Sequence, residues 1–139
     1  MDITALPFNQ LIGLARSDQE GALLSLPGEV RYTNHLGTIH AGALLALAEN
    51  TSGEYLLREF RDVGFAVLPV VRRLEAKFRH PARGAVHASA VLTPEAKAEF
   101  LATLTTKSRA FLDVDVEVRD DGGTPVMTAT VGWFIARQE

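Results

Sequence analysis

Residues 41–60 read AGALLALAENTSGEYLLREF, and this stretch decides the fold that we expect for the chain. Residues 41–48 are all apolar or glycine, and polar positions begin only afterwards, with Glu54 and Arg58 on one side. The pattern predicts a helix that is buried nearly all round in its first half and amphipathic in its second half. Such a helix needs another layer of the protein to cover it.

That second layer is predicted by the segments after the helix, where the apolar period changes to two. Apolar and polar residues alternate over 73–79, 86–92, 112–119 and 127–135. Asp120–Gly123 reads as a hairpin turn, and Thr93 with Pro94 suits the start of a short helix. Strict alternation gives each strand one covered face. The expected fold is therefore α+β, with an antiparallel sheet wrapped around a long central helix.

The region before the central helix gives weaker signals. Residues 6–15 are compatible with a short helix, although Gly13 weakens it. Residues 21–26 read as a first short strand that ends at Pro27 and Gly28. Residues 29–39 read as a polar loop.

Composition limits the classes of function. The 139 residues suit one domain over 1–139, and the formal net charge of −3 offers no basic field for nucleic acid or an anionic membrane. The absence of cysteine excludes disulfides and thiol catalysis. The N-terminus lacks the pattern of a signal peptide, and the longest apolar block is far shorter than the ~20 residues of a membrane span. We expect a cytoplasmic protein.

Glu49 is the most informative candidate, because it follows the apolar block on the central helix. Burying a carboxylate without partners costs several kcal/mol, so its presence needs a reason. A position at the polar edge of the helix is the alternative explanation. The helix start near Ala41 offers free N–H groups to developing negative charge, but it lies about 12 Å from Glu49 along the axis. A site that uses both requires two chains, and therefore an oligomer.

The loop and helix together resemble a known family. Asn34, Gly37, His40, Gly42 and Glu49 match the N-x-x-G-x-x-H-G-G loop and the following helical acid of hotdog-fold thioesterases of the phenylacetyl-CoA and 4-hydroxybenzoyl-CoA type. The element order over residues 20–136 is also similar. Ala41 replaces the first glycine after the histidine, and residues 94–107 resemble a subgroup with a helical insertion.

The resemblance implies hydrolysis of an acyl-CoA-type thioester at a subunit interface of a homodimer or homotetramer, without a cofactor. Glu49 would be the general base or the nucleophile, and the backbone at Ala41 and Gly42 would polarise the carbonyl. Asn34 would position water or the acyl group. His40 would hold the loop.

Two alternatives stay open. A hotdog module of this kind could bind acyl groups without hydrolysing them. His35 lies fourteen positions before Glu49, a spacing similar to that of hotdog hydroxyacyl dehydratases, which would use the pair as acid and base. The Pro-Gly that opens the dehydratase helix is absent, and an ordinary loop histidine is the commonest explanation for His35.

Basic residues between 72 and 83 form the last candidate group. A solvated sheet face is the usual explanation for such a charge run. The functional hypothesis is contact with the phosphates of CoA, with Arg79 and Arg83 as the first candidates. The histidines have no helical or Cys-paired spacing, so no metal site is predicted.

Overall fold

The structure, a computed structural model, describes residues 1–138. Its helical elements are the 3-10 helices η1 (Ile3–Ala5) and η2 (Val30–Tyr32) and the α-helices α1 (Pro7–Leu11), α2 (Ala41–Glu59) and α3 (Pro94–Lys107). Its strands are β1 (Ala15–Arg16), β2 (Leu24–Leu26), β3 (Val67–Phe78), β4 (Val86–Val91), β5 (Arg109–Asp120) and β6 (Pro125–Arg137).

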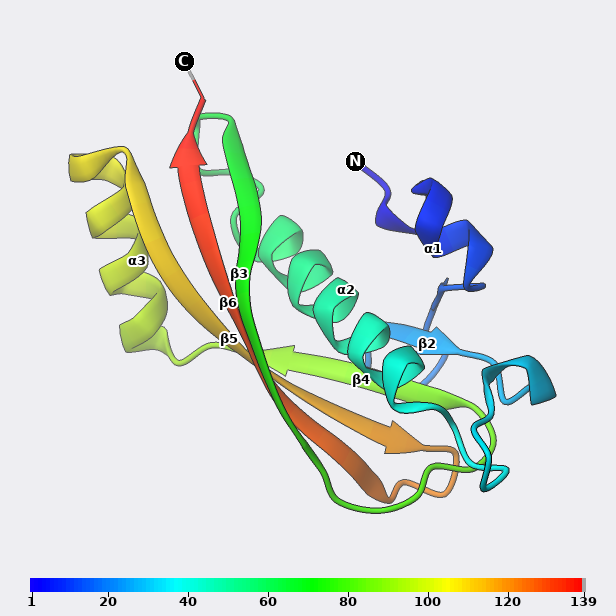
Figure 1. The fold of residues 1–139 in the computed structure, drawn as a ribbon. Coiled ribbons are helices and arrows are strands. Elements are labelled where there is room, and N and C mark those ends of the chain that lie inside the picture. Colours follow the sequence, from blue (N-terminus) through cyan, green and yellow to red (C-terminus); the bar gives the residue numbers. More distant parts are fainter. Residues whose placement is uncertain (139) are drawn as a thin grey trace.

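The strands of the described region form one antiparallel sheet in the order β1-β2-β4-β5-β6-β3. The long strands β3, β5 and β6 curve past α2, which lies along the concave side (Figure 1). The predicted α+β hotdog fold, a sheet wrapped around a central helix, is confirmed. Strand β3 is an edge strand, because it pairs with β6 on one side only.

The core lies between the sheet and α2, as the two-residue period predicts. Every second residue of β5 is buried, and the residues between them are largely exposed. Strand β6 contributes a matching row, and both rows face α2. The buried apolar side chains of these two strands are those of Ala110, Leu112, Val114, Val116, Val118, Val126, Met127, Ala129, Val131, Trp133 and Ile135.

Helix α2 begins at Ala41 and ends at Glu59. Within a single chain its first half is less buried than the sequence predicts: Ala41 and Gly42 are exposed, and Leu45 and Ala46 are half-buried. The sheet covers only one side of the helix, so this apolar stretch keeps an open face. In the part of the chain that the structure describes, no helix has the length and apolar character needed to cross a membrane.

The N-terminal helix is shorter than predicted. Helix α1 ends at Leu11, because Gly13 adopts φ +67°, a left-handed conformation that breaks a helix. Ala15 and Arg16 then pair with β2 as a short edge strand. The predicted helix after Thr93 is present as α3, and the Thr93 side chain accepts a hydrogen bond from the Ala96 N–H.

Candidate functional site

The start of α2 presents one free backbone donor. His40 is the N-cap residue, and its Nδ1 accepts a hydrogen bond of 2.8 Å from the Gly42 N–H. The N–H groups of Ala43 and Leu44 both donate to the His40 carbonyl. Among residues 1–138, the Ala41 N–H has no acceptor, so it remains available at the positive end of the helix dipole.

The Asn34 side chain organises the loop that leads to α2. Its Oδ1 accepts hydrogen bonds from the N–H groups of Leu36 and Thr38, and its Nδ2 donates to Thr38 Oγ1 over 3.0 Å. The Asn34 amide is therefore engaged within its own loop. This bonding fixes the loop beside Ala41.

Asn34, Ala41 and Arg79 line one hollow of about 340 Å³, which we call the helix-start hollow. It lies between the loop, the first turn of α2 and the end of β3. His40 and Gly42 line a separate hollow of about 310 Å³ on the other side of the helix start. The structure thus brings three of the predicted site residues around one space and places two others beside it.

Glu49 lies on the open side of α2, half-buried. In the described part of the chain its carboxylate has no hydrogen-bond or ion-pair partner, and burial alone raises its pKa above the ordinary value of 4.5. Desolvation favours the neutral acid, which makes the ionised carboxylate a stronger base. A side chain of this kind suits proton transfer better than structural pairing.

One chain does not bring Glu49 and the helix start together. Both belong to the continuous helix α2, in which eight residues separate Glu49 from Ala41. At 1.5 Å per residue the two positions are about 12 Å apart along the axis. Within a single chain, therefore, one carbonyl group cannot touch both.

The remaining predicted residues lie near the surface. Arg79 Nε donates to Thr128 Oγ1 over 3.2 Å at the end of β3. Arg83 is exposed in the loop between β3 and β4 and does not line the helix-start hollow. His35 is exposed at the tip of its loop, in the turn that follows Asn34.

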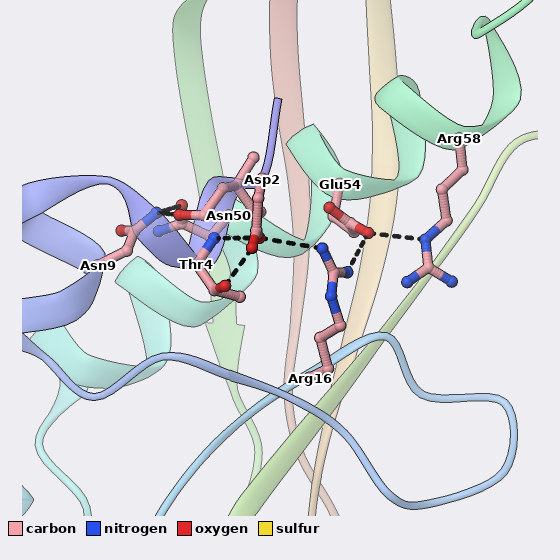
Figure 2. Close-up of polar contacts among 8 residues, drawn as sticks. Asp2, Thr4, Asn9, Arg16, Asn50, Glu54 and Arg58 are labelled. Atoms are coloured by element: carbon pink, nitrogen blue, oxygen red, sulfur yellow. Dashed lines mark hydrogen bonds and ion pairs between the residues drawn. The ribbon is translucent and has the colours of Figure 1, made fainter.

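A second glutamate of α2, Glu54, lies in the interior. The sequence pattern places Glu54 on the polar side, but its side chain is only 6% exposed and bonds both Arg16 and Arg58. Asn9 Nδ2 also donates to Asn50 Oδ1 over 2.7 Å (Figure 2). These bonds fasten the N-terminal segment to α2. The i,i+4 spacing of Glu54 and Arg58 is a sequence signal for half of this cluster, whereas Arg16 has none.

His87 belongs to another polar cluster, on the far face of β4. Its Nδ1 lies 2.8 Å from Ser17 Oγ and its Nε2 lies 3.1 Å from Asp121 Oδ1. The imidazole therefore links the β1–β2 connection to the β5–β6 turn. In residues 1–138 no group of three or more His, Asp and Glu side chains is arranged to hold a metal ion.

The fold is shared with several solved structures. A protein of unknown function from Pseudomonas aeruginosa, described as a probable thioesterase, is 26% identical with a TM-score of 0.77; the alignment covers 96% of this chain and 89% of that one. A protein of unknown function from Chlorobaculum tepidum is 22% identical with a TM-score of 0.82, over 98% and 90%. A Bacillus halodurans protein solved with CoA is 20% identical with a TM-score of 0.68, over 92% and 74%.

Sequence comparison gives the family. Among curated proteins none matches the chain. The model of one protein family, described as a domain of unknown function (DUF4442), matches residues 13–135 and so spans α2, α3 and almost the whole sheet. The chain belongs to this DUF4442 family and has a hotdog-like fold that it shares with thioesterase-related structures.

Proposed function

We propose that this protein hydrolyses an acyl-CoA-type thioester in a site shared between two copies of the chain. The observation that carries the proposal is Glu49, a half-buried carboxylate of raised pKa without a partner among the described residues. A carboxylate whose pKa is raised by burial is a stronger base when ionised, which suits general-base catalysis. The Bacillus halodurans relative solved with CoA supports the choice of thiol.

The chemistry needs two groups at one carbonyl. Glu49 removes a proton from water, whose oxygen attacks the thioester carbon, and the C–S bond breaks to release the acid and the thiol. Direct attack by Glu49 through an anhydride is the second route to the same products. In both routes negative charge develops on the carbonyl oxygen, and the free Ala41 N–H is the matching donor.

A second copy of the chain supplies the missing geometry. Strand β3 is a twelve-residue edge strand with exposed apolar side chains at Leu68, Val70 and Phe78, the kind of edge that invites pairing. Antiparallel pairing of two β3 edges about a two-fold axis sets the Phe78 end of one strand beside the Val67 end of the other. The helix-start hollow of one chain then approaches the open face of α2 in its partner.

In this arrangement Glu49 and Ala41 of the partner subunit act on the same thioester. Arg79, which lines the helix-start hollow, is placed to meet the phosphates of CoA, and Arg83 remains a second candidate further out on the same loop. His40 acts as a positioning residue through its bond to the Gly42 N–H, which leaves Ala41 as the free donor.

The decisive experiment measures thiol release from short, medium, long and aryl acyl-CoAs. We expect Glu49→Gln to reduce kcat/KM by about 100-fold to 10,000-fold, because it keeps the shape of the side chain and removes the base. The matched control is Glu59→Gln on the same helix, which loses an exposed carboxylate paired with Lys97 and should retain activity.

Four outcomes are informative. Loss of release in Glu49→Gln with retained folding supports the proposed role, and unchanged release rejects it. Binding of acyl-CoA without turnover by the wild type would instead indicate an acyl-binding module. Sedimentation of the wild type as a monomer at assay concentration, with full activity, would reject the shared site.

A further inference from the structure

A cavity of about 510 Å³ opens at the C-terminal end of α2, between this helix, α3 and the inner face of the sheet. We call it the Trp133 cavity. Aromatic rings contribute to its wall, and the rings of Phe60, which directly follows α2, and Phe100 on α3 meet with centroids 5.0 Å apart. The aromatic lining residues are Phe60, Phe65, Phe100 and Trp133.

The wall of the cavity begins on α2 one turn after Glu49. Gly53, one turn after Glu49, lines the cavity, and Phe60 lines it two further turns along. Residues at i, i+4 and i+11 share one side of a helix. The distance along the axis is about 6 Å from Glu49 to Gly53 and about 10 Å from Gly53 to Phe60.

Gly53 leaves open space in the cavity wall beside Trp133. A Cβ atom built at this position would meet the Trp133 ring at 3.5 Å, which is ordinary van der Waals contact. Space therefore exists beside the ring, and the absence of a side chain leaves it free. Trp133 is held in place by its Nε1–H, which donates to Ser52 Oγ over 3.0 Å.

Three of the four charged residues in the cavity wall pair with one another, and the fourth, Arg61, is exposed. Glu54 bonds both Arg16 and Arg58, so these side chains present no unpaired carboxylate to an apolar guest. Apolar walls with few polar groups are typical of sites for small apolar ligands. The elongated course along α2 suits an extended alkyl chain better than a single aromatic ring.

We propose that the Trp133 cavity receives the tail of an unbranched medium-chain acyl group, whose thioester carbonyl lies at Glu49. This inference rests on the proposed thioesterase function and adds the substrate class. Helix α3, inserted between β4 and β5, supplies Phe100 and Leu104 to the wall and so limits the length of the chain that fits.

The test compares kcat/KM across acetyl-, butyryl-, hexanoyl-, octanoyl- and decanoyl-CoA. Burial of each methylene group should raise wild-type kcat/KM about fourfold until the cavity is full. Gly53→Leu should abolish this rise. Phe60→Ala should shift the optimum to longer chains. Ala102→Leu, which adds the same side chain at an exposed position of α3, is the control and should keep the wild-type profile.

A binding measurement separates failure of the cavity from failure of the hydrolysis. Trp133 is the single tryptophan, so its fluorescence reports directly on the cavity. S-octyl-CoA, a thioether that cannot be hydrolysed, should bind more tightly than S-ethyl-CoA and change the emission, and Gly53→Leu should remove the difference. This result without turnover supports the cavity and rejects the hydrolysis. Equal binding of the two thioethers, or a wild-type chain-length profile in Gly53→Leu, overturns the cavity proposal.

Discussion

Glu49 and Glu54 lie five positions apart on α2 and differ by roughly 140° around the helix axis. Glu54 faces the N-terminal segment, and its carboxylate bonds Arg16 from that segment and Arg58 from α2 itself. Glu49 faces the open side, where burial raises its pKa and no partner among residues 1–138 compensates. Two glutamates of one helix thus differ in role: Glu54 forms structural ion pairs, and Glu49 is a candidate base.

These two glutamates differ more in their bonding partners than burial alone would suggest: Glu54 bonds two arginines, and Glu49 bonds none among residues 1–138. The more deeply buried glutamate is the one with two cations, as the desolvation cost requires. Glu49 is less buried and has no such cation among residues 1–138, so its desolvation raises its pKa. Each of the following changes tests this contrast.

Replacement of Glu54 should have the largest effect on stability. Glu54→Gln leaves Arg16 and Arg58 without their carboxylate and should lower the free energy of unfolding by about 3 kcal/mol. Denaturant unfolding followed by circular dichroism measures this loss. Arg58→Gln leaves the bond between Arg16 and Glu54 in place and should lower the free energy of unfolding by less. An equal or larger loss would contradict stabilisation of Glu54 by both arginines.

The second contact of the N-terminal segment should contribute less. Asn9→Ala removes the donor to Asn50 Oδ1 and to the Ile3 carbonyl, and leaves buried acceptors unsatisfied at a cost of about 2 kcal/mol. Gln10→Ala, at the exposed neighbouring position, is the control and should change stability little. Hydrogen exchange would show faster opening of residues 1–16 in Asn9→Ala alone.

The smallest effect concerns stability as a function of pH at Glu49. Because its folded-state pKa is raised, the folded protein binds a proton more readily than the unfolded chain, and ionisation costs stability as pH rises from the ordinary value of 4.5 through the folded-state pKa. Glu49→Gln should therefore be more stable than the wild type above this window. The advantage should vanish below it. A constant difference across pH in paired unfolding curves would show that burial does not perturb Glu49.

The alternation of residues predicts the fold, because strict two-residue periods allow one buried face for each strand and a long apolar helix must lie against it. The same logic finds the sheet rows that end at Trp133 and Ile135, the start of α2 at Ala41 and the inserted helix after Thr93. Periodicity overestimates the length of α1, because it does not reveal that Gly13 adopts a left-handed conformation that ends the helix.

The sequence alone determines that Glu49 and Ala41 share a helix and lie about two turns apart, because helix geometry follows from chain spacing. It also selects Asn34 and His40 as neighbours of the helix start. Only the tertiary structure decides that Glu54 is buried between arginines and that, at the start of α2, the Ala41 N–H has no acceptor among residues 1–138. It also decides that aromatic rings from α3, β6 and the segment after α2 line one cavity. These features join residues far apart in the chain, and their contacts depend on how the layers pack rather than on any local pattern.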